Sequence, residues 1–368
     1  MTSTSAKLPQ QPCWTSKMLT KNAVLAIGGG VGPSAGVGLH QKIIHATRTD
    51  GTDQSHFNII HISRSPHVQD RTKFLLGEIT TNPGEGMAEA VISIKAAADK
   101  TGNVAVVAVP CNTFHAPKIW ERFVARLVEL GADGTTLRLV HMLDETVKLI
   151  KEMAPEAKNI GLMSTTGTRS SRVYHDLLEP LGYTVIEVPP EKQGELHDAI
   201  YNKSWGIKAV SPVTLKAVNE FRGFAATLKA AGAEIAILGC TEIPLALPEP
   251  DFDGMVLVDP VEAAARAMVR MADESKLLPR GGESDHEQVH FHRISAPTTA
   301  KAMFKAASVG THWKKLAHKR KAELENKLKL AHHKEEGAVT PASPASLAAA
   351  FVSGIALSLC VSFVFARK

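Results

Sequence analysis

Cysteine is scarce in this sequence of 368 residues, which contains only Cys13, Cys111, Cys240 and Cys360. Cysteines spaced so widely fit neither a zinc site nor the dense disulfide framework of a small secreted domain. No set of His, Asp and Glu residues stands at metal-ligand spacing either, so we expect no metal site. Cys13 lies in an N-terminal leader and Cys360 in an apolar tail. That leaves Cys111 and Cys240 as the cysteines of the folded part.

The N-terminus lacks a secretory signal, because residues 1–21 contain no sufficiently long apolar run. These residues also lack Asp and Glu, a composition compatible with an organellar transit peptide, that of a chloroplast among them. We therefore expect residues 1–21 to be a disordered leader.

A basic charge spread over the whole chain is also missing. The net charge is +5, but the window 300–334 alone carries ten Lys and Arg against two Glu, which leaves −3 for the rest. The globular part is mildly acidic and gives no argument for nucleic-acid binding. A hydrophobic fraction of 44% and a charged fraction of 21% are those of an ordinary globular protein. The length suffices for one large α/β domain or two smaller lobes.

Short apolar runs alternate with stretches of helical periodicity over most of the chain. The expected strands are 23–27, 57–62, 104–109, 137–140, 160–163, 184–188, 235–238 and 256–258, and clear helical stretches are 86–100 and 116–130. Near-continuous apolar strands that alternate with helices predict an α/β fold with parallel sheets covered on both faces.

The strand pattern occurs twice, and each copy carries one cysteine. Cys111 and Asn112 directly follow one expected strand, and Cys240 and Thr241 directly follow another. Ligands of open α/β sheets bind at the carboxyl ends of the strands. Two similar lobes that face each other would bring the cysteines together across a cleft.

The character of the chain changes after Arg280. Residues 280–300 are polar and predict a linker, and 301–336 form a lysine-rich helical segment. Residues 347–366 are twenty residues without a charge, which at about 1.5 Å rise per residue match a hydrocarbon core of roughly 30 Å. We expect a C-terminal transmembrane helix there, with the basic segment drawn to anionic lipid; a helix packed on the domain is the alternative.

A cysteine at a strand–helix junction is placed for a lowered pKa, because a helix N-terminus favours the thiolate. A single nucleophilic cysteine needs a nearby base. His115 is close in sequence to Cys111, but no histidine follows Cys240. The symmetric alternative is a thiolate on one side of the substrate and a thiol on the other. That pair suits removal of a proton next to a carboxylate.

A carbanion next to a carboxylate needs strong hydrogen-bond support. The helix opened by 32–36, with Pro33 at its start, and the hydroxyl-rich segment 164–168 could supply donors. The triple glycine at 28–30 lacks the G-x-G-x-x-G spacing, so we expect no dinucleotide site.

Six segments of the chain together resemble the aspartate/glutamate racemase superfamily. They are Gly29-Gly30-Val31-Gly32-Pro33-Ser34-Ala35-Gly36, Asp53-Gln54-Ser55-His56, Asp70-Arg71-Thr72, Pro110-Cys111-Asn112-Thr113, Met163-Ser164-Thr165-Thr166-Gly167-Thr168 and Leu238-Gly239-Cys240-Thr241-Glu242-Ile243-Pro244-Leu245. The resemblance covers roughly residues 22–278.

The resemblance implies two pseudo-symmetric αβα lobes with the active site in the cleft between them. Lobe 1 would comprise 22–133 and 255–279, and lobe 2 would comprise 134–254. The resemblance makes Cys111 and Cys240 the catalytic acid and base, without a cofactor. The substrate-binding residues it implies are Pro33, Arg71, Asn112, Thr113, Thr165, Thr168, Lys208, Thr241 and Glu242. Arg71 and Lys208 would bind the distal group of the substrate.

Within the superfamily we expect the chain to be closest to the algal dimethylsulfoniopropionate (DMSP) lyases, which release dimethyl sulfide and leave acrylate. That branch is favoured by the leader and tail, by the stretch 200–212 and by the segment 63–65. A substrate without an amino group, such as DMSP, also needs no acidic side chain to bind an ammonium group. An amino-acid racemase is the alternative, and a membrane-tethered, non-catalytic binding protein is a remote one.

The partners expected from the sequence are a small carboxylate substrate, membrane lipid and further copies of the chain. The tail would anchor the protein to a membrane, with its catalytic part in the cytosol. Superfamily members commonly pair, so we expect a homo-oligomer.

Overall fold

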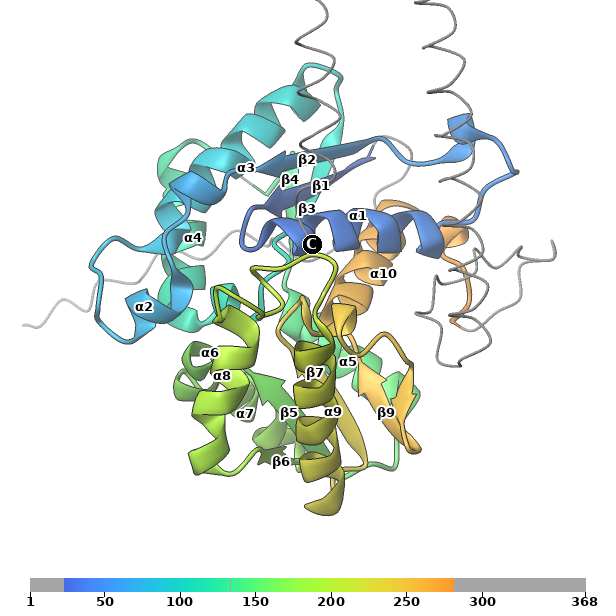
Figure 1. Cartoon of the computed structure of the whole chain (residues 1–368). Helices are drawn as coiled ribbons and strands as arrows, with labels where there is room; N and C mark the ends of the chain where they lie inside the picture. Colours follow the sequence, from blue (N-terminus) through green and yellow to red (C-terminus); the bar gives the residue numbers. More distant parts are fainter. Residues whose placement is uncertain (1–22, 133, 281–368) are drawn as a thin grey trace, which may run out of the picture. The chain divides into compact units, whose positions relative to one another are not determined.

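The computed structural model describes residues 23–132 and 134–280 (Figure 1). The expected leader, the basic segment and the expected membrane span at 347–366 lie outside these residues, so they stay predictions. Over the described ranges, no helix is long and apolar enough to cross a membrane.

The first half of the described chain contains β1 (Ala23–Gly29), α1 (Pro33–Ala46), β2 (Ile59–Ser63), α2 (Arg71–Leu75), α3 (Pro83–Asp99), β3 (Val104–Ala108), α4 (Pro117–Glu129), β4 (Leu137–Val140) and α5 (Met142–Met153). The second half contains β5 (Asn159–Ser164), α6 (Thr166–Ser170), α7 (His175–Leu178), β6 (Thr184–Glu187), α8 (Gln193–Tyr201), α9 (Leu215–Ala230), β7 (Ile235–Gly239), β8 (Asp251–Phe252), β9 (Met255–Val258) and α10 (Pro260–Asp273). The described 3₁₀ helices are η1 (Asp53–Ser55), η2 (Ser65–His67), η3 (Asn112–His115), η4 (Glu179–Leu181), η5 (Pro190–Lys192), η6 (Ile243–Leu245) and η7 (Glu274–Lys276).

The strands form two sheets that repeat one topology. The first has the order β2-β1-β3-β4, and the second has the order β6-β5-β7-β9-β8. The pairs are parallel, apart from the antiparallel pair of the short β8 with β9. In each sheet the third strand of the copy lies beside the first, and a cysteine follows that third strand. The predicted α/β class and its doubled pattern are confirmed.

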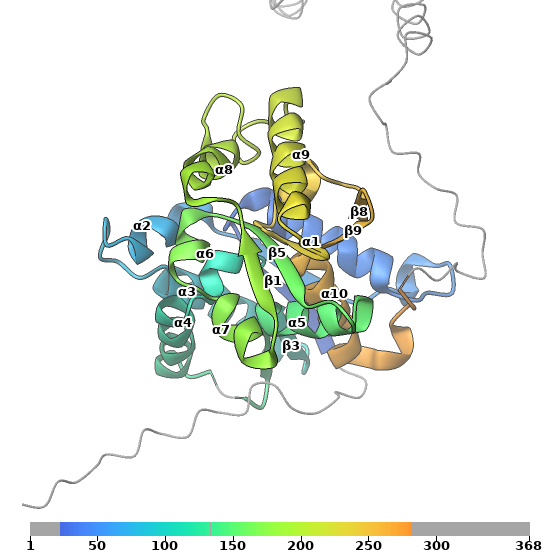
Figure 2. The same ribbon diagram turned by 90° about the horizontal axis from the view of Figure 1, so that it is seen from below.

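Helices cover both faces of each sheet, as buried apolar strands require. Helix α3 packs on one face of the first sheet, and α1 and α10 pack on the other (Figure 1). Seen from below, α8 and α9 lie on one side of the second sheet and α5 and α7 on the other (Figure 2).

One hydrophobic core joins the two halves. Leu25 and Ile27 of β1, Ile235 and Ile237 of β7 and Met268 of α10 belong to the same buried cluster. Each such side chain contributes about 1.5–3 kcal/mol when it leaves water. Helix α10 contacts both α1 and α5, so the last helix returns to the first half. The shared core holds the carboxyl ends of the two sheets in a fixed relation.

The sheets divide the chain at other points than the expected lobe boundaries of 133/134 and 254/255. Strand β4 belongs to the first sheet, because Leu137 pairs with Ala105 of β3. Strand β9 belongs to the second sheet, because Val256 pairs with Ile235 of β7. Helix α10 and the residues directly after it return to the first half, where Leu277 forms a β-bridge with Thr47. The two strands are apolar like the others, so their sequence does not show which sheet they join.

Candidate active site

Cys111 stands just beyond β3, where the chain leaves the first sheet. Its backbone is extended, and the 3₁₀ helix η3 begins with the next residue, Asn112. The Cys111 side chain is 6% exposed and packs with the core of the first half. Because β3 lies inside the sheet, this turn faces the carboxyl edge at which α/β folds bind ligands.

Cys240 occupies the same place in the second sheet, one residue beyond β7. It is 5% exposed and packs with a separate cluster of the second half. Both cysteines are free thiols. The repeated topology thus carries one thiol on each half of the molecule.

The two cysteines line one cavity, together with residues from both halves. Its walls are Val31, Arg71, Cys111, Asn112, Thr113, Thr165, Tyr201, Lys208, Gly239, Cys240 and Thr241. The cavity is nearly closed, at about 10 Å³, which is room for roughly one water molecule. A larger substrate therefore requires its walls to separate. Of the nine substrate-binding residues expected from the sequence, six line this cavity.

Arg71 brings a buried positive charge to the side of Cys111. It is the first residue of α2, whose N-cap is Asp70, and it is 9% exposed. Burial alone would lower the pKa of Arg71, but its interactions with Cys111, Tyr201 and Asp70 raise that pKa overall. A thiolate at Cys111 would have this guanidinium as its counter-ion.

Arg71 also has one N–H donor that is not hydrogen-bonded to any described residue. Its Nη1 and Nη2 groups donate to the carbonyl oxygens of Gln69 at 3.2 Å and Val31 at 3.4 Å. Its Nε is buried and has no hydrogen-bond partner among the described residues. A buried donor without a partner costs about 1–3 kcal/mol, so an anionic ligand in the cavity would remove a real penalty.

Glu242 links Cys240 to a charged network that includes Thr241 and Lys208. Glu242 Oε2 accepts hydrogen bonds from Cys240 Sγ at 3.3 Å and from Thr241 Oγ1 at 3.0 Å. Its Oε1 pairs with Lys208 Nζ at 2.7 Å. Burial would raise the pKa of Glu242, but Lys208 and the three hydrogen bonds lower it, so the carboxylate is ionised.

The Cys240 thiol is held in its protonated form. Burial, opposed by Lys208 and supported by Glu242, raises the pKa of Cys240 to about 12. A carboxylate acceptor at the sulfur stabilises the S–H form, since a thiolate there would repel it. The two cysteines therefore differ in their surroundings: Arg71 lies beside Cys111, whereas the Lys208–Glu242 ion pair lies beside Cys240, whose thiol hydrogen-bonds the carboxylate.

Asn112 offers a second buried donor to the cavity. The Tyr174 hydroxyl donates to Asn112 Oδ1 at 2.5 Å and fixes the amide. Asn112 Nδ2 is buried without a partner in the described part of the chain. Together with Arg71 Nε, it gives the cavity two unpaired N–H donors.

Three threonine hydroxyls connect the halves next to the cysteines. Thr113 Oγ1 lies 3.2 Å from Thr165 Oγ1 and 2.8 Å from Thr168 Oγ1, and the last two are 3.1 Å apart. Thr165 is also the N-cap of α6 and accepts from the Thr168 backbone N–H. Thr113 and Thr165 line the cavity, whereas Thr168 is not among its lining residues and hydrogen-bonds both of them.

The structure does not bring Pro33 to the cavity. Pro33 is exposed at the start of α1 and is not among the residues that line the cavity, so its expected contact with substrate stays a prediction. The preceding loop turns Val31 and Gly32 inward instead. A side chain at Gly32 would overlap Glu242 Oε1 and would come within 3.3 Å of Lys208 Nζ. Glycine at this position therefore makes room for the Lys208–Glu242 pair.

His115 is not placed as a base for Cys111. Its Nδ1 hydrogen-bonds the Cys111 carbonyl oxygen at 2.9 Å, and its Nε2 accepts from the Met142 N–H at 3.2 Å. Burial and the nearby His141 keep the pKa of His115 well below its usual value, so the ring is neutral. His115 supports the backbone of the cysteine turn.

Sequence reasoning missed Tyr201 and Tyr174 as parts of the site. Tyr201 ends α8 and lines the cavity, with Lys208 Nζ 5.7 Å from its ring centre. Burial raises the pKa of Tyr201 to about 12, so its hydroxyl stays neutral. In the sequence, Tyr201 stood out only as a member of the stretch 200–212, which was noted for its resemblance to the DMSP lyase branch. In the described ranges, no group of three or more His, Cys, Asp or Glu side chains could hold a metal ion.

Comparison with known proteins identifies the family and the fold. Residues 29–268 match the family model of Asp/Glu/hydantoin racemases, so the chain belongs to that family. The structure is similar to Picrophilus torridus aspartate racemase, with a TM-score of 0.55 and 21% identity over 70% of this chain and 96% of that one. An aspartate racemase homologue from Pyrococcus horikoshii OT3 matches with a TM-score of 0.48 and 21% identity over 68% of this chain and 99% of that one.

Family membership indicates an enzyme, and the fold is that of the racemases. The expected superfamily resemblance is thereby confirmed. The matches do not single out the DMSP lyase branch.

Proposed function

We propose that the protein is a racemase of a dicarboxylic amino acid such as aspartate or glutamate, with Cys111 and Cys240 as its two proton-transfer groups. The observation that carries the proposal is the shared cavity. It holds one thiol from each half, the cations Arg71 and Lys208, and two buried N–H donors without partners. Cations and free donors on the walls suit a substrate with two carboxylates.

The two ends of such a substrate would use different parts of the wall. Asn112 Nδ2 and the threonine hydroxyls would hold the α-carboxylate and stabilise the charge that develops on it when the α-proton leaves. Arg71 and Lys208 would hold the side-chain carboxylate. In this arrangement the α-carbon would lie between the sulfurs of Cys111 and Cys240, which line the same cavity.

The proton balance assigns the resting roles of the cysteines. Cys111, beside Arg71, starts as the thiolate and takes the α-proton, while Cys240 starts as the thiol and gives its proton to the opposite face. After one turnover Cys111 is a thiol and Cys240 a thiolate. The reverse reaction, or proton exchange with water, restores the starting state. No cofactor enters this scheme.

DMSP lyase is the second candidate here, whereas the sequence alone placed it before the racemase. One observation favours it: none of the described residues that line the cavity is a carboxylate, and Glu242 is already paired with Lys208, so among the described residues an α-ammonium group finds no free acidic partner. DMSP has no amino group. Its sulfonium, however, would face Arg71 and Lys208, two cations. We therefore place the racemase first.

A substrate panel separates the two candidates. The full chain is incubated with L-aspartate, L-glutamate, L-alanine and DMSP, and chiral chromatography and headspace gas analysis follow the products. The proposal expects racemisation of a dicarboxylic amino acid at least about tenfold faster than of alanine, since alanine lacks the charge-assisted contact with Arg71 and Lys208. Dimethyl sulfide without racemisation would reverse the order of the candidates.

A further inference from the structure

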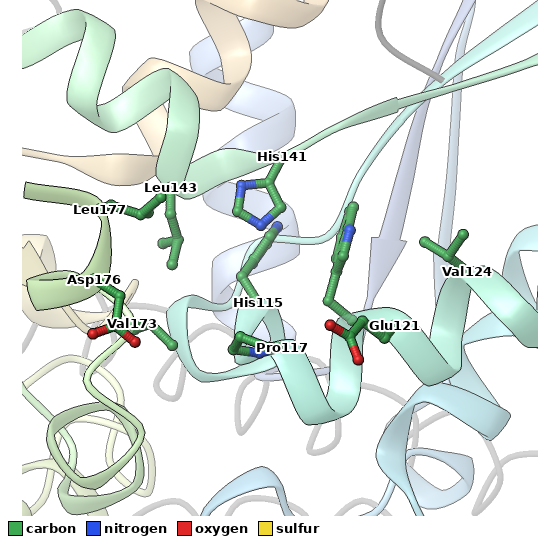
Figure 3. Close-up of a pocket in the computed structure, with 10 residues that line it drawn as sticks. His115, Pro117, Glu121, Val124, His141, Leu143, Val173, Asp176 and Leu177 are labelled. Carbon is green, nitrogen blue, oxygen red and sulfur yellow. The ribbon is translucent and has the colours of Figure 1, made fainter. Parts of the chain in front are cut away.

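A second cavity, of about 310 Å³, lies on the other side of the cysteine turn. It is lined by His115, Pro117, Trp120, Glu121, Val124, His141, Leu143, Val173, Asp176 and Leu177 (Figure 3). This volume is within the range of small-molecule sites, at its lower end. The four-residue helix η3 separates the two cavities: its residues Asn112 and Thr113 line the catalytic one, and its last residue, His115, lines the second.

Two contacts connect the wall of this cavity to the catalytic site. His115 holds the Cys111 carbonyl oxygen through Nδ1 and the start of α5 through Nε2. Tyr174, between the lining residue Val173 and the helix α7, donates its hydroxyl to Asn112. A molecule that displaces either wall would move Cys111 or Asn112.

The lining fixes the kind of molecule that fits. Its aromatic side is formed by His115 stacked on Trp120, with ring centres 4.7 Å apart, and by His141 nearly perpendicular to both. Apart from Glu121 and Asp176, the other lining residues are aliphatic or proline. Aromatic walls of this kind favour flat apolar groups and, through their faces, cations.

The charge around the cavity is negative. Glu121 and Asp176 lie on opposite sides of Pro117 (Figure 3), and no Lys or Arg is among the lining residues. Glu121 forms no ion pair within the described ranges, and Asp176 has only Arg172 at 3.8 Å. Burial keeps the pKa of His115 well below its usual value, so this ring adds no positive charge, and Arg172 is the cation that the structure places beside Asp176.

We propose that this cavity is a regulatory site for a small organic cation with an aromatic body, and that its occupation changes the reactivity of Cys111. The regulatory half of the proposal rests on the proposed role of Cys111 in catalysis. The binding half is independent of it. The aromatic group would lie against Trp120 and His141, and the cationic group would face Glu121 and Asp176.

Binding is tested on the full chain by calorimetry with tryptamine, a cation with a flat aromatic body. Tryptophol and indole-3-propionate are matched probes in which the amine is replaced by a neutral hydroxyl or by a carboxylate. The proposal expects affinity in the order tryptamine, tryptophol, indole-3-propionate. Equal affinity of the three, or no binding of tryptamine, would overturn the assignment of a cation site.

Variants locate the probe. Glu121→Gln should weaken tryptamine about two- to fivefold, the effect of one exposed carboxylate, whereas Glu156→Gln, an exposed acid elsewhere, should not. Trp120→Leu should weaken it at least about fivefold, with Trp205→Leu as the control outside the cavity. If neither Glu121→Gln nor Trp120→Leu weakens tryptamine binding, the assigned location is contradicted.

The coupling between the second cavity and Cys111 is measured without substrate, so the result does not depend on which reaction the protein catalyses. The rate at which iodoacetamide alkylates Cys111 is measured by peptide mass spectrometry with and without saturating tryptamine. The proposal expects at least a threefold change at Cys111 in the wild type and none in Trp120→Leu. Binding without any change at Cys111 would refute the regulatory role. A dimer that tryptamine or Trp120→Leu dissociates in sedimentation would identify the surface as a subunit interface and overturn the proposal.

Discussion

The thiol of Cys240 donates a hydrogen bond to the carboxylate of Glu242 across 3.3 Å, and Lys208 balances that carboxylate from its other side. Cys111 has a different neighbour, the guanidinium of Arg71. Two thiols in equivalent places of a repeated fold therefore have different charged neighbours: the Arg71 guanidinium beside Cys111, and the Lys208–Glu242 ion pair beside Cys240. This asymmetry supports the proposed resting state, in which one sulfur is ready to accept a proton and the other ready to give one.

Replacing Glu242 by Gln should make Cys240 more acidic. The substitution removes the anion that favours the thiol and leaves Lys208, which favours the thiolate, so the pKa of Cys240 should fall from about 12. The pH dependence of iodoacetamide labelling, read separately for each cysteine, measures this. We expect the Cys240 labelling midpoint to drop by at least about one pH unit and the Cys111 profile to stay in place. An unchanged or higher Cys240 midpoint would show that Glu242 does not hold the proton.

Arg71→Lys should lower kcat/KM for a dicarboxylic substrate roughly 10- to 100-fold. Lysine keeps the charge, but it loses the unpaired Nε donor and the two hydrogen bonds to Gln69 and Val31. Arg71→Ala should be worse still, because it also removes the counter-ion of Cys111. Steady-state kinetics of both variants, with circular dichroism to verify the fold, would settle the point; a lysine variant with wild-type kcat/KM would contradict the assigned contact.

Gly32→Ala should damage the site without unfolding the protein. The added methyl group would overlap Glu242 Oε1 and press on Lys208 Nζ, which would separate the pair that surrounds Cys240. Gly38→Ala, inside helix α1 that begins directly after Gly32, adds a methyl group that meets no atom outside the helix backbone within 4 Å and is the control. Turnover and thermal melting are compared in the two variants. We expect activity to fall at least about tenfold in Gly32→Ala only, and equal activities would argue against the close approach.

Tyr174→Phe should weaken the hold on Asn112. The phenylalanine ring fills the same buried space but cannot donate to Asn112 Oδ1, so the amide would lose its fixed orientation. The expected loss is about 0.5–1.5 kcal/mol in the free energy of unfolding, together with a lower kcat. Tyr183→Phe, which leaves that hydrogen bond untouched, serves as the reference in denaturant unfolding and in turnover. Identical stability and turnover of the two variants would show that Tyr174 does not position Asn112.

The strands and the cysteine turns could be predicted because buried parallel strands are apolar along their whole length. All eight expected strands are present, and each cysteine follows the strand that the sequence indicates. The sheet to which 137–140 and 255–258 belong could not be predicted, since pairing partners of short apolar runs are not written in the runs themselves. Their places depend on the order β2-β1-β3-β4 and its repeat.

The site was predictable at the residues next to the cysteines and less so away from them. Pro33 opens the expected helix, but the loop directs Val31 and Gly32, not Pro33, to the interior. Glu242 was expected to contact substrate, whereas its carboxylate is taken up by Lys208 and Cys240. The Lys208–Glu242 pair depends on two side chains 34 residues apart meeting in space, which spacing along the chain does not reveal.

The most direct test of the account is α-proton exchange in deuterium oxide, with L-aspartate or L-glutamate as substrate and the full chain as enzyme. Mass spectrometry and chiral chromatography together report deuterium at the α-carbon and the configuration of each product. The account predicts that the D-enantiomer forms with one deuterium, and that Cys111→Ser and Cys240→Ser each abolish racemisation while retaining the wild-type circular dichroism. Full racemisation by either serine variant would contradict the two-cysteine mechanism.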